Sequence, residues 1–459
     1  MDLGWLFERM AASEPRGEVI WNDRVTSHTQ LLGHVARWRA RIASSEFEGA
    51  GVVAVEGDFT PEAIALILAL IEADRVVIPL THQAALAKST LCRISEAQSY
   101  LAIDDEGRDC HERLAVTPCN PVLTELLTRG EAGVVIFSSG TTGEPKAVLH
   151  SAQRLLERYR TQPRPVRMLT FLLFDHIGGL NSLFYALASG GAVVSLANRD
   201  PESVCMAIER HRVEVLPTSP TFLNLLLLSG AAQRHDLSAL RKVQYGTEVM
   251  PATTLARLRE AMPRVEFQQT YGLSEMSILR SRSRDDGSLW VRLGGDGYET
   301  EVRDGVLWIR GRSAMLGYLN AESPFDSEGW LNTGDAVAVD GDYIRILGRR
   351  TEMINVGGEK LHPAEVESVL LNLPNIVDVA VRGVSNPISG QAVVARVYLA
   401  EPEERSHLLK RMRAYCRDRL APYKVPVRVE ISCHPLHSNR FKKRRLNDSA
   451  GGDRKQHGE

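Results

Sequence analysis

The sequence has few cysteines, almost no net charge and no long apolar run, and each shortage excludes a class of protein. Six cysteines are scattered over 459 residues without a Cys-x-x-Cys pair. This argues against a disulfide framework or a zinc site and favours a reducing cytoplasm. The 55 basic and 57 acidic side chains leave a formal net charge of -2. Bulk charge therefore gives no reason to expect nucleic acid or an anionic membrane as the main partner.

The longest apolar stretch, residues 63–71, is bounded by Glu62 and Glu72 and is much shorter than the roughly 20 residues of a membrane span. We expect it to form a buried helix, with Thr60 as the cap and Pro61 in the first turn. The first residues carry no basic region ahead of an apolar core, which argues against a signal peptide. Neither feature predicts a membrane protein.

Helix-like segments followed by strand-like segments recur in the first part of the chain, for example at residues 183–196 and 201–217. This alternation predicts an α/β fold with mostly parallel sheets flanked by helices. From about Val302, short strands and tight turns indicate a small β-rich subdomain.

After residue 350 the pattern changes again. Pro363 is expected to open a helix with an apolar stripe at 366, 369, 370 and 373, two strands follow, and a basic helix is expected over 402–420. We therefore expect a large domain over residues 1–350, a small mobile α+β lid over 351–446 and a disordered polar tail over 447–459.

A segment rich in glycine and hydroxyl residues directly follows an apolar run, residues 133–137, that predicts a buried strand. Its members are Ser138, Ser139, Gly140, Thr141, Thr142, Gly143 and Lys146. Glycines allow close backbone approach, hydroxyls donate hydrogen bonds and the lysine adds positive charge, so this composition predicts a phosphate-binding loop at the carboxyl end of a strand. It is not a Walker loop, because Glu144 and Pro145 separate Gly143 from the lysine.

Four further motifs follow along the chain, together with a lysine near the C-terminus. They are Gln-Thr-Tyr-Gly-Leu-Ser-Glu at 269–275, Thr-Gly-Asp at 333–335, Leu-Gly-Arg-Arg at 347–350 and Asn-Val-Gly-Gly-Glu-Lys at 355–360. With the loop above, they resemble the acyl-adenylate-forming superfamily: acyl-CoA and aryl-CoA synthetases, freestanding adenylation domains and luciferases. The resemblance covers nearly the whole chain, to Leu446. It implies an enzyme that joins a carboxylic acid to the α-phosphate of ATP, releases pyrophosphate and passes the acyl group to a thiol.

The resemblance also implies roles for individual residues. The loop at 138–146 and Ser274 would bind phosphates, and Glu275 would hold Mg²⁺, which is usually bound by one or two carboxylates plus phosphate oxygens. The implied AMP-binding residues are Gly246, Thr247, Glu248, Tyr271, Gly272, Asp335 and Arg349. The implied cofactors are ATP, Mg²⁺, and CoA or the phosphopantetheine of a carrier protein.

The acyl pocket is less sharply defined. The resemblance places Asp175, His176, Gly178, Gly179 and Tyr245 there, with His176 also a catalytic candidate. His176 either gates the carboxylate or is a satisfied residue at a helix start, and Asp175 either faces a substrate amine or caps that helix. Tyr245 and Thr247 depart from the family's usual turn, which leaves the shape of the pocket and the identity of the acid open.

The lid carries two further expected sites. Gly357 and Gly358 resemble the glycines that line the thiol tunnel after the lid has rotated. Relatives have Gly-Lys-x-x-Arg near the C-terminus, and placing Phe441 at the glycine makes Lys442 the catalytic lysine, with an arginine three residues on. The alternative, Lys443, loses that arginine, so we expect Lys442 to act in catalysis.

The sequence therefore predicts an AMP-forming acid-thiol ligase that acts on a small carboxylic acid, with CoA as the expected acceptor. One alternative is a freestanding enzyme that loads a carrier protein. Another is an inactive nucleotide-binding relative, against which the intact Lys146, Glu275, Asp335, Arg349 and Lys442 argue. The acid, the acceptor and the oligomeric state stay open.

Overall fold

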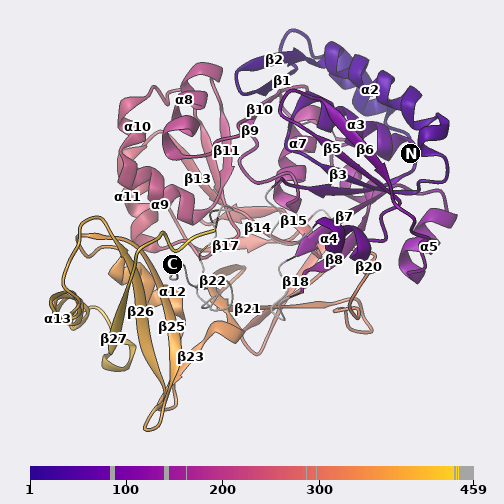
Figure 1. Cartoon of the computed structure of the whole chain (residues 1–459). Helices are drawn as coiled ribbons and strands as arrows, with labels where there is room; N and C mark the ends of the chain where they lie inside the picture. Colours follow the sequence, from indigo (N-terminus) through magenta and orange to yellow (C-terminus); the bar gives the residue numbers. More distant parts are fainter. Residues whose placement is uncertain are drawn as a thin grey trace, which may run out of the picture.

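The computed structural model shows a large N-terminal part and a small C-terminal lid (Figure 1). It describes residues 1–82, 88–138, 144–161, 163–285, 287–295 and 297–438, together with Phe441 and Lys443. Within these ranges the large part contains two seven-stranded sheets, a six-stranded sheet and a two-stranded one, and the lid contains a five-stranded sheet. This is the α/β architecture with a β-rich subdomain that the sequence predicts.

The first seven-stranded sheet has the strand order β20-β8-β7-β4-β3-β5-β6 within the described residues. The central pairs β7/β4, β4/β3 and β3/β5 are parallel. The pairs toward the two edges, β5/β6, β7/β8 and β8/β20, are antiparallel. The strands are β3 (Val52–Glu56), β4 (Val76–Leu80), β5 (Ser99–Ile103), β6 (Asp109–Arg113), β7 (Gly133–Ser138), β8 (Lys146–Ser151) and β20 (Gly317–Tyr318). The helices around it are α1 (Gly4–Ala11), α2 (His28–Ile42), α3 (Pro61–Glu72), α4 (Lys88–Ile94), α5 (Pro121–Thr128) and α6 (Ala152–Glu157), with a 3₁₀ turn at Ser45–Phe47.

Helix α3 is the buried helix that the apolar run predicts. The Thr60 hydroxyl accepts a hydrogen bond from Ala63 N at 3.2 Å, and Pro61 occupies the first turn. Residues 63–71 are all buried. A helix that is apolar on every side must be covered on every side, and α3 belongs to a core that also contains Val53 of the first sheet and Val193 of the second. The helix thus joins the two sheets.

The second seven-stranded sheet has the order β13-β12-β11-β9-β10-β1-β2 within the described residues, and only its β1/β2 pair is antiparallel. Its strands are β1 (Glu18–Trp21), β2 (Arg24–Ser27), β9 (Arg167–Leu169), β10 (Ala192–Ser195), β11 (Val215–Thr218), β12 (Lys242–Tyr245) and β13 (Glu266–Gln269). The associated helices are α7 (Ile177–Ser189), α8 (Pro201–His211), α9 (Pro220–Ser229), α10 (Ala231–Arg234) and α11 (Ala252–Ala261). The parallel strands bring the carboxyl ends of β9, β11, β12 and β13 to one edge, where ligands of such sheets bind.

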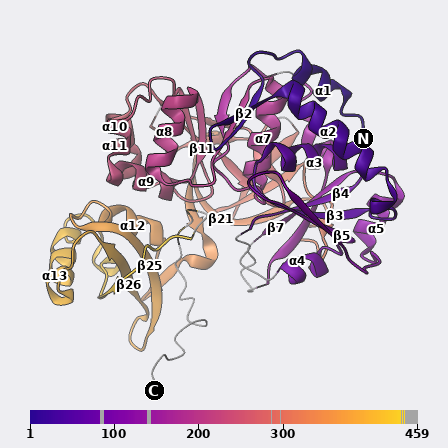
Figure 2. The same ribbon diagram turned by 45° about the horizontal axis from the view of Figure 1, so that its top comes forward.

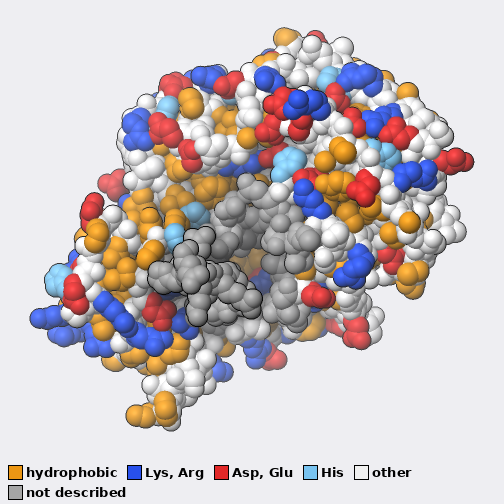
Figure 3. Space-filling model, in the orientation of Figure 1, with side chains coloured by type: hydrophobic (Ala, Val, Ile, Leu, Met, Phe, Trp, Pro, Cys, Tyr) orange, Lys and Arg blue, Asp and Glu red, His pale blue; other side chains and the backbone are white. Residues whose placement is uncertain are grey.

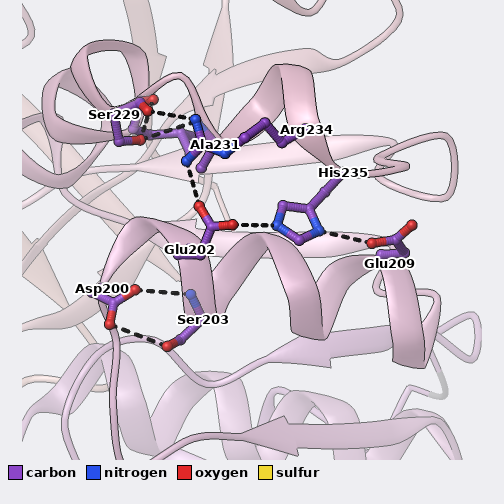
Figure 4. A network of polar contacts seen from close by, with 9 residues as sticks. Asp200, Glu202, Ser203, Glu209, Ser229, Ala231, Arg234 and His235 are labelled. Atoms are coloured by element: carbon purple, nitrogen blue, oxygen red, sulfur yellow. Dashed lines mark hydrogen bonds and ion pairs between the residues drawn. The ribbon is translucent and has the colours of Figure 1, made fainter.

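A polar network fastens α10 to α8 on the outside of this sheet (Figure 4). The His235 ring lies between two carboxylates of α8, with Nε2 at 2.9 Å from Glu202 Oε1 and Nδ1 at 2.7 Å from Glu209 Oε2. Arg234 also bonds to Glu202. Glu209 and then Glu202 raise the pKa of His235 because both carboxylates favour its protonated form. The network is structural and lies away from the cavity described below.

The β-rich subdomain begins earlier than the sequence suggests, near Ser281 instead of Val302. Its sheet has the order β16-β17-β22-β21-β19-β18 within the described residues. The strands are β16 (Ser281–Ser283), β17 (Val291–Leu293), β18 (Tyr298–Arg303), β19 (Val306–Gly311), β21 (Leu331–Asp340) and β22 (Tyr343–Arg349), and a separate hairpin is formed by β14 (Tyr271–Leu273) and β15 (Ser277–Leu279). Strands of three residues are too short to show an alternating apolar pattern, which is why β16 and β17 escaped prediction.

The lid has a hydrophobic core of its own, to which its sheet and both of its helices contribute. Its elements are β23 (Ile354–Val356), β24 (Glu359–Leu361), α12 (Pro363–Leu370), β25 (Ile376–Asn386), β26 (Gly390–Leu399), α13 (Arg405–Cys416) and β27 (Arg428–Ser432), with 3₁₀ turns at Arg350–Glu352 and Pro422–Lys424. Both helices are shorter than predicted: α12 ends before Leu373, and α13 covers 405–416 instead of 402–420. The expected domain boundary falls in the first 3₁₀ turn.

The lid lies beside α9 and α11 of the large part (Figures 1 and 2). Lys and Arg side chains gather on its surface in the region of α13 (Figure 3), in keeping with the basic composition of that helix. None of the described helices is long and apolar enough to cross a membrane. All six cysteines are unpaired thiols.

Candidate functional site

A cavity of about 3380 Å³ lies where the two large sheets, the β-rich subdomain and the lid meet. The large part contributes residues at the carboxyl ends of β7, β11, β12 and β13, and the lid contributes residues from β23, β25 and β26. Among the sequence-predicted site residues, those that line it are Ser138, Lys146, Asp175, His176, Gly178, Gly246, Thr247, Gly272, Ser274, Glu275 and Arg349. Residues from distant parts of the sequence thus share one space.

The predicted phosphate loop connects two paired strands. Strand β7 ends at Ser138, β8 begins at Lys146, and these two residues are paired across the hairpin. The loop residues Ser139, Gly140, Thr141, Thr142 and Gly143 lie outside the described residues. The Asn320 side chain holds the end of the loop, because its amide donates to Pro145 O at 2.9 Å and its oxygen accepts from Ala147 N at 2.9 Å.

Tyr318 connects Lys146 with Glu275, and the sequence showed no sign of this connection. The Lys146 ammonium lies 4.9 Å above the centre of the Tyr318 ring, and the Tyr318 hydroxyl donates to Glu275 Oε1 at 2.6 Å. Burial and the neighbouring Glu275 carboxylate raise the pKa of Tyr318, so the hydroxyl stays a donor. Strand β20 brings Tyr318 here by pairing with β8.

A buried histidine forms a hydrogen bond to the main chain of the Tyr271-to-Glu275 segment. His150 of β8 donates from Nε2 to Ser274 O at 2.6 Å, and Met315 N donates to Glu275 O at 2.8 Å. Burial lowers the pKa of His150 to about 4, which keeps the imidazole neutral near pH 7. Because the main-chain oxygens of Ser274 and Glu275 both accept hydrogen bonds, the backbone is held in place and both residues stay at the cavity wall.

Asp335 and Arg349 are paired across β21 and β22. Arg349 Nε lies 2.9 Å from Asp335 Oδ1, and Arg349 Nη1 donates to Thr333 O at 2.6 Å. The Tyr271 hydroxyl donates to the other oxygen of Asp335. Burial raises the pKa of Asp335, and the Arg349 charge opposes that rise. Asp335 and Tyr271 therefore lie just behind the cavity wall formed by Thr333, Gly334 and Arg349, and the Tyr271 ring is not part of the lining that the structure describes.

The turn after β12 shows why glycine is needed at position 246. A Cβ there would come within 2.6 Å of Thr270 Oγ1 and 2.9 Å of Thr270 O, so a side chain would displace the neighbouring strand end. The next residue, Thr247, adopts a φ of 71°. Tyr245 is fully buried in the core of the second sheet, because alternate residues of a strand face opposite sides, and it does not belong to the described cavity wall.

The residues expected to form the acyl pocket begin at the start of α7. His176 caps this helix: its Nδ1 accepts from Gly178 N at 3.0 Å. This agrees with the alternative that His176 is a satisfied residue at a helix start, and it gives the capping role, one of the two alternatives for Asp175, to His176. Asp175 is buried and accepts from Thr81 Oγ1 at 3.4 Å. Gly179 is packed away from the cavity, where a Cβ would lie 2.2 Å from Leu173 O.

Polar side chains from β12 and β13 also line the cavity. Lys242 and Gln244 line the cavity from alternate positions of β12, Gly246 lines it just after the strand ends, and Gln268 lines it from β13. Lys242 Nζ lies 3.1 Å from Glu266 Oε1, and the Gln268 amide donates to Ser281 O at 2.8 Å. Sequence reasoning missed these residues, although a strand that alternates polar and apolar residues is a usable signal.

The lid presents its C-terminal segment to the large part in this arrangement. Lys443 N donates to Glu248, whose carboxylate also accepts from Thr221 Oγ1 at 2.6 Å. Glu248 thus contacts the lid and is outside the described cavity lining, as are Gly357 and Gly358, which form the β23-β24 turn. Lys442 lies outside the described residues.

The side chain of Lys443 is committed to the lid. Its ammonium lies 3.5 Å from Glu367 Oε2 and 3.9 Å from Asp378 Oδ1, and all three side chains are largely buried. Burial raises the pKa of Asp378, while Lys443 counteracts that rise. Lys443 also belongs to the cavity lining, but its ammonium is paired with two carboxylates of the lid. The choice of Lys442 over Lys443 as the catalytic lysine stays a prediction.

The comparisons with known proteins agree with this geometry. The model of the AMP-binding enzyme family matches residues 47–319, and that of the AMP-binding enzyme C-terminal domain matches residues 365–440. The chain belongs to the AMP-binding enzyme family.

Two relatives match over nearly the full length of both chains. Indoleacetate–CoA ligase of Aromatoleum aromaticum is 28% identical over 94% of this chain and 94% of the relative. 2-Succinylbenzoate–CoA ligase of Bacillus licheniformis is 27% identical over 92% of this chain and 94% of the relative. Among solved structures, the anthranilate CoA ligase AuaEII in complex with anthranoyl-AMP has a TM-score of 0.78 at 19% identity and covers 96% of this chain and 95% of its own. That likeness establishes the fold.

Proposed function

We propose that this protein is an ATP-dependent ligase that converts a small carboxylic acid into an acyl-AMP and then into a CoA thioester. The observation that carries the proposal is that Lys146, Tyr318 and Glu275 lie in contact on one wall of a cavity. Arg349 lines the next wall, with Asp335 paired to it just behind that wall. Full-length similarity to CoA ligases supports the same conclusion.

In the first step a carboxylate oxygen attacks the α-phosphorus of ATP, the bond to the β-phosphate breaks, and pyrophosphate leaves. Negative charge spreads over the phosphate oxygens in the transition state, so catalysis depends on cations and donors already in place. Lys146 and Ser274 provide such groups at the wall, and the two oxygens of Asp335 with the Arg349 guanidinium suit the ribose and the nucleotide. In the second step the thiol sulfur attacks the acyl carbon and AMP leaves.

The residues present fit a magnesium ion held mainly by the nucleotide. The described residues contain no group of three His, Cys, Asp or Glu side chains that could form a metal cage, and Mg²⁺ beside phosphates needs only one or two protein carboxylates. Glu275 would hold the ion, which would neutralise charge developing on the leaving pyrophosphate. The Tyr318 hydroxyl fixes the orientation of the Glu275 carboxylate.

The acyl end of the cavity favours a compact acid with a polar far end. Following β12 away from Gly246, the wall offers Gln244 and then Lys242, spaced by two residues and so by about 7 Å. A long alkyl chain would cover these polar groups without pairing them, which costs free energy. A substituent that accepts hydrogen bonds, or a second carboxylate, would meet the Lys242 ammonium instead.

The test is acid-dependent exchange of labelled pyrophosphate into ATP over a panel of aryl, short-chain, medium-chain, long-chain and amino acids, some with a second polar group. We expect exchange with at least one compact polar acid and little with long-chain acids. Product analysis with CoA and with a phosphopantetheinylated carrier protein then identifies the acceptor. Exchange with none of these acids would contradict the proposal, and thioester formed only on the carrier would change the acceptor.

Glu275→Gln keeps the shape of the side chain but removes its charge, so exchange should fall by about a hundredfold or more. Tyr318→Phe removes one hydrogen bond to that carboxylate and should cost about tenfold. The matched control is Glu299→Gln, a surface carboxylate of the β-rich subdomain paired with Arg310. Near-normal exchange in Glu275→Gln would remove Glu275 from the site.

A further inference from the structure

The C-terminal segment of the lid inserts an aromatic side chain into the large domain. The Phe441 ring centre lies 5.2 Å from that of Phe171 and 5.5 Å from that of Phe222, both of which are buried in the core of the second sheet. On its lid side, the ring stacks on His437 at 5.6 Å with an interplanar angle of 18°. These ring separations are within the range of favourable aromatic contacts. One side chain therefore joins the two domains.

Hydrogen bonds to the main chain of Phe441 hold the same segment at the N-terminus of α9. Ser219 Oγ donates to Phe441 O at 2.8 Å, and Phe441 N donates to Ser438 O at 2.9 Å. Phe441 adopts a φ of 50°, a left-handed conformation that suits glycine and is unfavourable for an aromatic residue. The ring contacts must outweigh this strain, because an aromatic residue without them would abandon the conformation.

The second point of attachment is Lys443, which is tied to both domains. Its main-chain N–H donates to Glu248 of the large domain, while its side chain is held by Glu367 and Asp378 of the lid. Two more hydrogen bonds cross between the domains near this point: Asn224 Nδ2 to Val377 O at 3.1 Å, and Thr253 Oγ1 to Ser368 O at 3.3 Å. Phe441 and Lys443, the residues on either side of position 442, are thus both attached to the large domain.

We propose that Phe441 is an interdomain latch that positions the C-terminal segment for acyl-AMP formation. The proposal builds on the proposed function, because it assigns the latch to the first of the two steps. The Gly357–Gly358 turn does not reach the described cavity wall in this arrangement, so its expected service in thioester formation requires the lid to reorient. That movement must withdraw the Phe441 ring from Phe171 and Phe222. The latch therefore favours the first step and restrains the passage to the second.

Three substitutions separate the ring from the backbone. Phe441→Ala removes the ring and keeps a Cβ at positive φ, Phe441→Gly removes the ring and relieves the backbone strain, and Phe441→Leu keeps an apolar side chain. The matched control is Ile431→Ala, which shortens an apolar lid residue that is 40% exposed on β27.

We expect pyrophosphate exchange to fall about tenfold in both the Ala and Gly variants, in line with the loss of several aromatic contacts. The Leu variant should recover part of this loss. Thioester formation from chemically supplied acyl-AMP should be unchanged or faster in all three, because release of the latch is no longer needed. Hydrogen exchange in the peptide covering 219–229 should increase in the Ala and Gly variants and not in Ile431→Ala.

Each other outcome overturns the latch. If Phe441→Gly exchanges pyrophosphate at the wild-type rate, the ring is not needed and only the backbone conformation at position 441 matters. An equal loss in both half-reactions would indicate a purely structural role. Unchanged hydrogen exchange in Phe441→Ala would show that the ring does not hold the segment on α9. If the wild-type protein activates no acid, the proposed function fails, and hydrogen exchange still decides whether Phe441 holds the domains together.

Discussion

The carboxylate of Asp335 is subject to two opposing influences. Burial favours its neutral form, whereas the Arg349 guanidinium 2.9 Å away and the Tyr271 hydroxyl favour the charged form. A carboxylate that already accepts two hydrogen bonds is rigidly oriented, and such preorganisation suits the recognition of neighbouring hydroxyl groups. The Tyr271 ring is held by the same bond and is not part of the described cavity lining, so its expected role in AMP binding stays a prediction.

Two adjacent lysines are expected to differ sharply when they are removed. Lys442→Ala should abolish acyl-AMP formation while supplied acyl-AMP still yields thioester, because a mobile positive charge is needed only while the acyl-phosphate bond forms. Two assays check this: pyrophosphate exchange for acyl-AMP formation, and thioester formation from supplied acyl-AMP for the second step. Retained exchange would show that Lys442 has no such role.

Lys443→Met is the matched variant, and the structure predicts that it affects stability. The substitution leaves Glu367 and Asp378 buried without their cation, so the lid should lose about 1 to 3 kcal/mol of stability. Urea unfolding of the variant measures this loss. If Lys443→Met is fully stable and is the variant without exchange, the assignment of the two lysines is reversed.

At the scale of elements, strand β8 supports the two functional segments from opposite ends. It begins with Lys146 after the phosphate loop, and near its other end His150 donates to Ser274 O beneath Glu275. β20 runs along it and delivers Tyr318. One buried strand thus sets the spacing between the expected phosphate and magnesium sites.

The His150 contact should make the large domain sensitive to acid. Burial holds the folded-state pKa of His150 at about 4, against about 6.5 in the unfolded chain, so the unfolded state binds more protons between these values. Stability is therefore lost as the pH falls from about 6.5 towards 4, and by pH 5 the loss is about 2 kcal/mol. Urea unfolding at pH 7 and pH 5 measures it.

His150→Gln, which keeps a donor for Ser274 O, should lose less stability than the wild type over the same interval. His434→Gln, at an exposed lid position, provides the control and should follow the wild type. An identical pH dependence in wild type and His150→Gln would show that His150 is not held neutral by its surroundings.

At the scale of the whole molecule, the lid holds the Gly357–Gly358 turn outside the described cavity lining. The Gly357–Gly358 turn points into open space, since a Cβ at either glycine would meet no atom within 4 Å. Gly358→Leu should therefore leave acyl-AMP formation nearly intact and slow thioester formation by about tenfold or more, because the side chain would obstruct the thiol only after the lid has moved.

Gly305→Leu is the control for backbone strain in this experiment. Gly305 also has a positive φ, 71° against 92° for Gly358, and equally open surroundings, but it lies in the β18-β19 turn. Separate assays of acyl-AMP and thioester formation distinguish the variants. Equal losses in both steps for Gly358→Leu, or the same pattern in Gly305→Leu, would exclude the tunnel role.

Much of the architecture could be predicted because its signals are local. The apolar run at 63–71 with Thr60 before it predicts helix α3, and the run before Ser138 predicts β7 at the base of the phosphate loop. Ordered motifs predicted the family in the same way. Elements were missed where the signal was too short, as in β16 and β17. The sequence also left open which of two neighbouring side chains caps α7, and the structure shows His176 in that position.

The sequence by itself determined the helices and strands, the phosphate-loop composition and the family, because each depends on residues close together in the chain. Only the tertiary structure decided the partners: Tyr318 on Glu275, His150 under Ser274, Lys443 between Glu367 and Asp378, and Phe441 on Phe222. These pairs are separated by 43 to 219 residues. Strand register and domain docking bring them together, and neither leaves a periodic signal in the sequence around any one of them.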